Sequence, residues 1–200
     1  MDQVFLLRLL ILETRKSGSS FAISHCFSEY ISMMNTPLPK DEALLQQILT
    51  SCEASRLLET KQFMQHGDTN VYDHCVAVAK VSCVLADKMG LSVDRESLIR
   101  GALLHDYFFY DWHVPDPGHR LHGFTHPKCA LQNAMDDFAL TPVEQDMILR
   151  HMFPLTPTPP KFREGWVLCL ADKLCSTLET AKFTQNSLVK GFYAGEETLQ

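Results

Sequence analysis

The sequence predicts an all-α fold, and three observations support this prediction. Apolar residues recur every three or four positions in several segments, as they do on one face of a helix. Residues that favour helix starts precede these segments, among them Thr69, Asp94 and the capping box Thr141–Glu144. A chain of 200 residues is long enough for one main domain with a substantial core. We therefore expect a helical bundle.

Composition limits the classes of partner. The formal net charge is −6 at pH 7 and the pI is near 5.8. General binding to long nucleic acid is not expected, because it relies on Lys and Arg side chains that neutralise phosphates. The seven cysteines include no Cys-x-x-Cys pair, and several lie within apolar helical patterns. This favours reduced, buried thiols and, by default, a cytoplasmic location.

The apolar run Val4–Leu12 lies at the start of the sequence. It has about half of the roughly 20 residues that a membrane span needs, and Arg8 interrupts it. We interpret it as a core-facing helix, and a short helix on a membrane surface is the alternative. Breaks at 17–20 and 35–39 delimit an N-terminal helical extension at 1–40. The main domain is then expected at 41–185, followed by a C-terminal tail at 186–200.

The first helices of the main domain lead to a candidate metal ligand. Apolar spacing predicts helical segments between Lys40 and His66, with Gly67 as a C-terminal cap. Thr69 then caps a helix that ends near Gly90, and His74 lies on its apolar side. A single histidine in such a position is more often a packed core residue, so its role depends on the next helix.

The segment Gly101–Tyr110 is strongly apolar and carries His105 and Asp106 at its centre. We predict that it is helical and buried. An uncompensated buried charge is costly or shifts its pKa, so the pair needs a partner. A metal ion is a suitable one for a neutral imidazole and an ionised carboxylate. Antiparallel packing across the short turn Leu91–Val93 would let His74 face this pair.

Three further candidate ligands follow. His126 precedes Pro127, at the entry of a helix predicted for Lys128–Phe138. His151 ends the helix that begins at the capping box. Asp172 lies on the buried face of a helix predicted for residues 163–180, where an unpaired carboxylate is uncommon.

The order His74, His105–Asp106, Asp172 on helical elements resembles the H…HD…D signature of the HD-domain metal-dependent phosphohydrolases, over about residues 60–180. The chain is also similar to a group of small bacterial HD-domain proteins. The resemblance implies a bundle of five or more core helices in which these four residues bind one divalent metal. His126 and His151 match the longer H…HD…H…H…D pattern, which implies a second metal bridged by Asp106. No lysine of the HD-G-x-x-K type follows Asp106, which argues against a cyclic-dinucleotide substrate.

The implied ligand set suits one or two Fe, Mn, Co, Ni or Zn ions per chain. A hydroxide activated by the metal would attack phosphorus, with His105 and Asp106 as catalytic residues of the centre. Lys173, His122 and His113 are candidate phosphate-binding residues, and each also has a simple structural explanation.

These observations give one leading hypothesis and two alternatives. The leading hypothesis is a phosphohydrolase that acts on a nucleotide or a related small phosphate ester. The first alternative is a diiron oxygenase of the HD type. The second is a noncatalytic sensor that uses the metal pocket to bind a nucleotide.

Overall fold

The computed structural model describes residues 39–52, 54–117 and 120–196, with side chains up to residue 181. The expected N-terminal helices, including Val4–Leu12, lie outside the described residues. The elements in chain order are α3 (Pro39–Ser51), the 3-10 helix η1 (Arg56–Gln62), β1 (Met64–His66), β2 (Thr69–Asn70), α4 (Val71–Lys88), α5 (Arg95–Leu104), α6 (His122–Asp137), α7 (Pro142–Arg150) and α8 (Arg163–Glu196). The described fold is therefore helical apart from one small antiparallel hairpin, as predicted.

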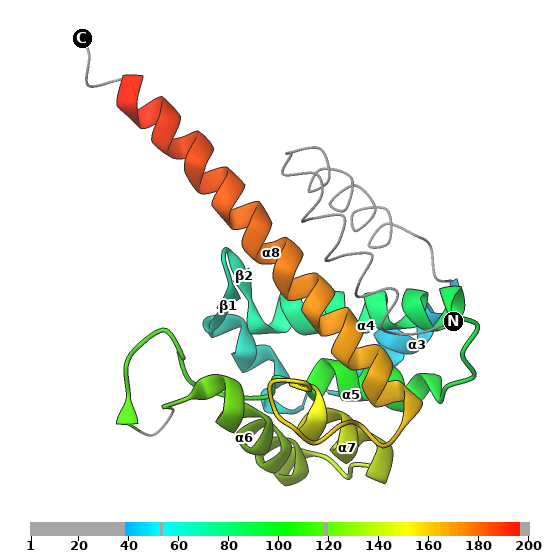
Figure 1. The fold of residues 1–200 in the computed structure, drawn as a ribbon. Coiled ribbons are helices and arrows are strands. Elements are labelled where there is room, and N and C mark those ends of the chain that lie inside the picture. Colours follow the sequence, from blue (N-terminus) through cyan, green and yellow to red (C-terminus); the bar gives the residue numbers. More distant parts are fainter. Residues whose placement is uncertain (1–38, 53, 118–119, 197–200) are drawn as a thin grey trace. The chain divides into compact units, whose positions relative to one another are not determined.

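Helix α4 lies at the centre of the bundle. It packs against both α5 and α8, and α7 contacts α5, α6 and α8 (Figure 1). Val71, Val78 and Val81 of α4 are fully buried, which is expected for a helix that neighbours cover on more than one side. Helices α3, α6, α7 and α8 thus each contact α4 or α5.

The start of α4 differs slightly from the prediction. Asn70 is its N-cap, and the Asn70 side chain accepts a hydrogen bond from the backbone N–H of Asp73. Thr69, the predicted cap, is paired in β2 instead. The end of the helix agrees with the prediction, since Gly90 has a positive φ of 63° directly after the C-cap Met89.

The helical prediction for the segment up to His66 was wrong in its last part. There the chain forms η1 and then the β1–β2 hairpin, and Gly67 lies in the hairpin turn with φ 60°. A glycine with positive φ suits a helix C-cap and a tight turn equally well. Gly67 therefore does adopt the positive φ that the sequence pattern indicated, but in a hairpin turn and not at a helix C-cap.

Helix α5 ends at Leu104, so the prediction of a helix through Tyr110 was also wrong. His105 is the C-cap, and the N–H of Phe108 donates to the carbonyl of Asp106 in the turn that follows. Tyr107 and Phe108 are almost completely buried. The apolar run 107–110 therefore reflects burial in the core rather than continued helix.

Helices α6 and α8 are longer than predicted. Helix α6 begins at His122 and includes Pro127 near its start, whereas the prediction placed Pro127 at the helix entry. Helix α8 continues to Glu196, beyond the predicted end at Thr180 and past the expected start of the tail at 186. The part of α6 that lies before the predicted start includes the buried residues His126 and Pro127.

Two predicted caps are confirmed. Thr141 and Glu144 form a full capping box at the start of α7, and Asp94 caps α5. Each such cap satisfies backbone N–H groups that have no partner within the helix. These two helices are the ones that end at His105 and His151.

Candidate metal centre

The six predicted ligands come from five parts of the fold and lie together in its interior. His105 and His151 are the C-caps of α5 and α7, and Asp106 follows His105. The other three lie on α4, α6 and α8: His74, His126 and Asp172. All six are buried. The predicted convergence of distant helices is therefore present in the structure.

One half of the cluster is formed by two imidazoles and two carboxylates. His74 Nε2 is 3.4 Å from Asp172 Oδ1, and His105 Nε2 is 3.3 Å from Asp106 Oδ2. The cross distances are 3.9 Å from His74 to Asp106 and 3.8 Å from His105 to Asp172. Two ligands bound to one ion at about 2.1 Å lie roughly 3 to 3.5 Å apart. This spacing fits a shared cation.

The other half of the cluster is formed by two imidazoles near the second carboxylate oxygen of Asp106, Oδ1. Asp106 Oδ1 is 3.1 Å from His126 Nε2 and 3.5 Å from His151 Nε2. The two Nε2 atoms are 2.8 Å from each other. The two oxygens of Asp106 thus face different pairs of imidazoles.

Each of the four imidazoles is oriented by a hydrogen bond at its outer nitrogen. His74 Nδ1 is 2.8 Å from Glu179 Oε2. The Nδ1 atoms of His105, His126 and His151 lie 2.7 to 2.8 Å from the backbone carbonyls of Ala102, His122 and Ile148. A carbonyl can only accept, so those three Nδ1 atoms donate, and in the neutral ring Nε2 then carries a lone pair directed at the cluster.

Several inner polar atoms of the cluster have no hydrogen-bond partner among the described residues. Among the described side chains, His74 Nε2, His105 Nε2 and Asp106 Oδ1 are buried without a hydrogen-bond partner. Buried polar atoms are rarely left in this state, because the loss of water costs free energy. Inward lone pairs and carboxylate oxygens are the donor atoms that divalent metals use. The residues therefore fit a metal site, and two overlapping groups within them could each hold an ion: His74–His105–Asp172 and His105–Asp106–His151.

A comparison with known protein families matches residues 71–177 to the HD domain. The chain belongs to the HD domain family. Searches of curated proteins and of solved structures found no match. The matched region contains all six residues of the cluster. HD domains bind divalent metals, and the buried His and Asp residues described above could hold one.

The cluster of His74, His105, Asp106, His126, His151 and Asp172 is called the HD centre. Electrostatic interactions within it keep both carboxylates, Asp106 and Asp172, ionised. Burial alone would raise the pKa of Asp106, but His105 and His126 hold that pKa well below its ordinary value. Burial opposes ionisation of Asp172 as well, and the neighbouring imidazoles of His105 and His74 lower its pKa by more. The centre thus presents two negative charges in a buried space, which a cation would compensate.

The imidazoles of the HD centre differ in charge. Burial lowers the pKa of His74, but the neighbouring carboxylates of Asp172 and Glu179 outweigh burial and raise the pKa to about 10. For His151, burial and the nearby His126 and His105 lower the pKa to about 3. His151 therefore stays neutral at physiological pH, which is the form in which histidine binds metals.

Two side chains that support the HD centre were not predicted from the sequence. The Gln65 amide nitrogen donates a hydrogen bond to Asp106 Oδ2, and its carbonyl oxygen accepts one of 3.2 Å from Trp112 Nε1. Glu179 orients His74. Glu179 lies two helical turns after Asp172 on the same face of α8, and this spacing was a signal available in the sequence.

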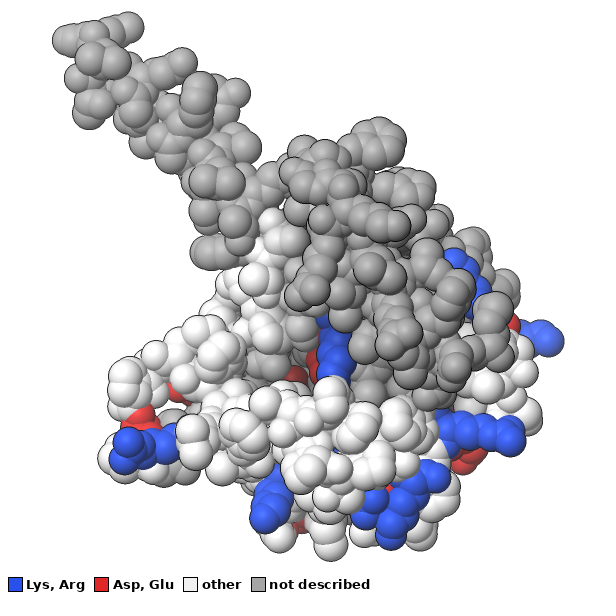
Figure 2. All heavy atoms as spheres, in the orientation of Figure 1, with Lys and Arg blue, Asp and Glu red and all other residues white. Residues whose placement is uncertain are grey.

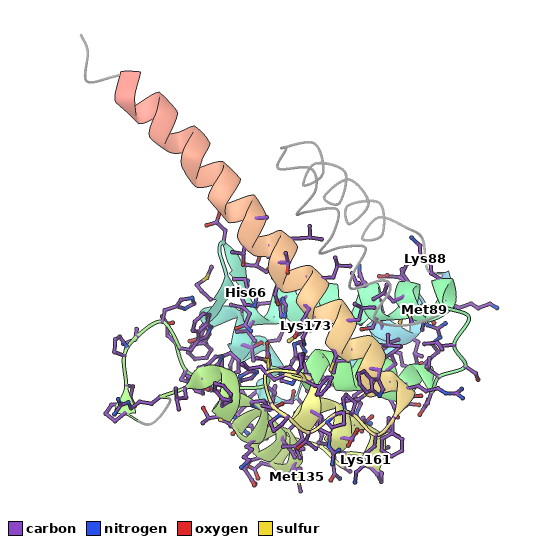
Figure 3. The ribbon with its side chains drawn as sticks, viewed as in Figure 1. His66, Lys88, Met89, Met135, Lys161 and Lys173 are labelled. Atoms are coloured by element: carbon purple, nitrogen blue, oxygen red, sulfur yellow. The ribbon has the colours of Figure 1, made fainter. Side chains whose placement is uncertain are left out.

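A cleft of about 920 Å³ leads to the HD centre. Asp106, His126, His151 and Asp172 form part of its lining, so the cluster is reached through it. Figure 3 shows His66 on β1 and Lys173 on α8, two further lining residues contributed by separate elements. The volume is within the range of small-molecule sites.

The structure places the three predicted phosphate-binding residues differently. Lys173 and His122 line the cleft. Lys173 Nζ donates to the carbonyl of His151 at 3.1 Å, and His122 Nδ1 is 2.9 Å from the hydroxyl of Tyr110. His113 is not part of the lining: it stacks on Trp112 at 3.9 Å, and its Nδ1 lies 3.0 Å from Asp111 Oδ1.

Two further observations concern the charged side chains on the surface and the apolarity of the helices. On the face shown in Figure 2, Lys and Arg side chains are scattered among larger uncharged areas. No helix in the described part of the chain has both the length and the apolarity to cross a membrane.

Proposed function

We propose that this HD domain protein is a metal-dependent phosphohydrolase that acts on a small phosphate ester, a class that includes the nucleotides expected from the sequence. The observation that carries the proposal is the position of Asp106. One of its oxygens faces His105 at 3.3 Å, and the other faces His126 at 3.1 Å. Asp106 in this position would help to hold two metal ions, an arrangement suited to phosphoryl transfer.

The proposed ligands divide into two sets around Asp106. His74, His105 and Asp172 would hold one ion together with Oδ2, and His126 and His151 would hold a second with Oδ1. Such nitrogen and oxygen donors suit Fe, Mn, Co, Ni or Zn. When bound, these ions lower the pKa of the attacking water and stabilise the charge that develops on the phosphoryl oxygens.

The protein itself would provide orientation and a place for the substrate. The outer hydrogen bonds at Nδ1 hold the ligand lone pairs toward the centre. Lys173 and His122 line the cleft beside the centre and are the proposed contacts for phosphate oxygens. In the reaction, an oxygen of water bonds to phosphorus, the ester P–O bond breaks, and the alcohol leaves with a proton.

The decisive experiment combines metal content with phosphate release. Protein purified without chelator would be analysed for metals and assayed with phosphate monoesters, diesters and nucleotides. Replacing Asp106 by Asn should remove bound metal and lower phosphate release at least about 100-fold, because both ligand sets share this carboxylate. The matched control is Asp136→Asn, which alters an exposed carboxylate on α6.

A second pair of variants tests the number of ions. His126→Ala or His151→Ala should lower the metal content from about two ions per chain to about one, since only the second set loses a ligand. A count near one in the unchanged protein would reduce the proposal to a single-ion centre. Oxygen consumption by iron-loaded protein, with no phosphate released from any ester, would contradict the hydrolase and support an oxygenase.

A further inference from the structure

The cleft has an apolar outer wall formed by two segments. Leu121 and Phe124 lie at the start of α6, and Met152, Pro154 and Leu155 follow α7. Leu121, Phe124 and Leu155 are 73%, 49% and 48% exposed. Large apolar side chains with this exposure, gathered along one cleft, are typical of a surface that a ligand covers.

The two segments meet closely at Gly123. A Cβ atom at this position would lie 3.1 Å from Leu155 Cδ2 and 3.8 Å from Met152 Cε. The absence of a side chain at Gly123 thus lets α6 approach the segment after α7. As a result, the apolar wall is continuous rather than two separate patches.

Leu121 holds an unusual backbone conformation at the edge of this wall. Its φ of 61° and ψ of 44° lie in the left-handed region, which residues other than glycine seldom adopt. The side chain gains no burial from this arrangement, because it is the most exposed of the large apolar residues among those described. A contact with a bound apolar group would account for its position.

Basic groups in the cleft are few. Lys173 is the only lysine or arginine in the described lining, and its Nζ already donates to the carbonyl of His151. Arg120 is exposed next to Leu121 but is not part of the lining. A di- or triphosphate carries several charges that proteins usually meet with Lys, Arg or backbone N–H groups. Beyond the metal centre, the described lining adds the imidazoles of His66 and His122 to Lys173, but no second lysine and no arginine.

Neutral polar groups near the centre already have partners. Ser176 Oγ donates to Asp172 Oδ1, and Thr177 Oγ1 donates to the carbonyl of Lys173. Gln65 is hydrogen-bonded at both its oxygen and its nitrogen. On the outer wall itself, the edge of a nucleobase or the hydroxyls of a sugar would meet only the apolar side chains of Leu121, Phe124, Met152, Pro154 and Leu155.

We infer that the substrate is a phosphate monoester of an apolar alcohol. Its single phosphate would lie at the metal centre, and its hydrocarbon or aromatic part would lie on Leu121, Phe124 and Leu155. The inference rests on the proposed function and narrows its substrate class. Hydrolysis would use one water and yield inorganic phosphate and the free alcohol, with no oxidation or reduction.

A series of n-alkyl phosphates from butyl to octyl tests the inference with metal-loaded protein. The leaving alcohols have nearly equal basicity, so differences in rate report binding of the chain. kcat/KM should rise by up to about fourfold with each added methylene until the wall is covered. Adenosine triphosphate and adenosine monophosphate serve as charged and polar comparisons, and both should be poorer substrates than octyl phosphate.

Variants locate the effect on the wall. Phe124→Ser and Leu155→Ser should flatten the dependence of kcat/KM on chain length. Met135→Ser is the matched control, because Met135 is 50% exposed on α6 but does not line the cleft (Figure 3). It should leave the dependence as steep as in the unchanged protein. Thermal unfolding of each variant shows whether it is folded.

The outcomes separate this inference from the proposed function. Hydrolysis of alkyl phosphates with no dependence on chain length, or a preference for adenosine triphosphate, would overturn the inference and leave a phosphohydrolase. No phosphate release from any ester would overturn both. A chain-length effect that survives in both wall variants would place the apolar part elsewhere and overturn the assigned surface.

Discussion

At the scale of single residues, the centre depends on how Asp106 is held. Gln65 donates to Asp106 Oδ2, and Trp112 in turn donates to Gln65. Trp112 also lines the cleft. This chain of hydrogen bonds connects a cleft side chain with a proposed metal ligand. Trp112 is therefore placed to report on changes at the centre.

Replacing Gln65 by Ala should weaken metal binding about 10- to 100-fold, because the hydrogen bond that orients Asp106 is lost. The chain has two tryptophans, so a Trp166→Phe background leaves Trp112 as the only reporter. Metal titration should change its fluorescence, and the change should shrink in the Gln65 variant. Gln132→Ala, at an exposed position on α6, is the control. Equal affinity and equal response in both proteins would argue against a positioning role for Gln65.

Some residues of the centre could be predicted from the sequence and others could not, for a physical reason. His74 and Asp172 are polar residues on apolar helix faces, and His105 and Asp106 interrupt an apolar run, so each is visible in the sequence pattern. Gln65 has no comparable signal in the sequence pattern. Its role depends on β1, which was predicted as the end of a helix and which places Gln65 beside Asp106. The sequence pattern therefore indicated residues that converge in the structure, but it did not indicate the Gln65 side chain that contacts Asp106.

At the scale of elements, close packing of α5 on α7 depends on Gly101. A Cβ at this position would lie 2.6 Å from Met147 Cε and 2.7 Å from Met147 Sδ. Met147 is fully buried, so its end has little room to move. These two helices carry His105 and His151 at their ends, and their separation therefore affects the centre.

Gly101→Ala should destabilise the protein by about 1 to 2 kcal/mol, because the cost of overpacking exceeds the gain in helix propensity. Urea unfolding measures the difference. The penalty should be smaller in a Met147→Ala background, where the colliding atoms are absent. An equal penalty in both backgrounds would show that the contact with Met147 is not its cause.

A second contact between elements connects η1 to the end of α6. Asp137 Oδ2 accepts hydrogen bonds from Arg56 Nε at 2.9 Å and from the hydroxyl of Tyr107 at 2.6 Å. Burial opposes ionisation of Asp137, but Arg56 and Tyr107 outweigh it and lower the pKa below the ordinary value of 3.8. The ionised form is therefore bound more strongly in the folded protein than in the unfolded chain.

Asp137→Asn should cost about 1 kcal/mol at pH 7. Since the pKa is lowered on folding, this contribution is complete above about pH 4 and is lost as pH falls through the folded pKa. Urea unfolding at pH 7 and near pH 3 should show the gap between the variant and the unchanged protein closing at the lower pH. Asp136→Asn provides the comparison, and a gap independent of pH would contradict an ionic origin.

Element boundaries were harder to predict than element types. The apolar run after Asp106 suits either continued helix or a buried irregular segment, because burial alone selects its residues. Pro127 is tolerated near the start of α6, so its position did not fix where the helix begins. The capping box at Thr141 was a more specific signal, since two side chains must be in register, and it marked the start of α7 correctly.

At the scale of the whole molecule, the buried thiols follow from the helical core. Cys52, Cys75, Cys83, Cys169 and Cys175 are buried, and no described cysteine is in a disulfide. Burial raises the pKa of Cys83 to about 12 and that of Cys169 to about 11. The thiolate, the reactive form, is therefore scarce at neutral pH.

In the folded protein, these cysteines should resist iodoacetamide at pH 7.5 for hours and react within minutes in denaturant. Mass spectrometry after timed alkylation counts the modified sites. A Cys26→Ser background is used, because Cys26 lies outside the described residues. Cys129, which is only partly buried, is the internal reference and should react first. Rapid alkylation of Cys83 in the native state would contradict the packing of α4.

The order of the proposed metal ligands along the chain has a consequence for biosynthesis. His74 lies on the first long helix of the matched HD domain and Asp172 near its end, on α8. When every helix up to α7 has left the ribosome, five of the six side chains have emerged, but Asp172 and Glu179 have not. Metal loading should therefore be one of the last events in maturation, dependent on the docking of α8.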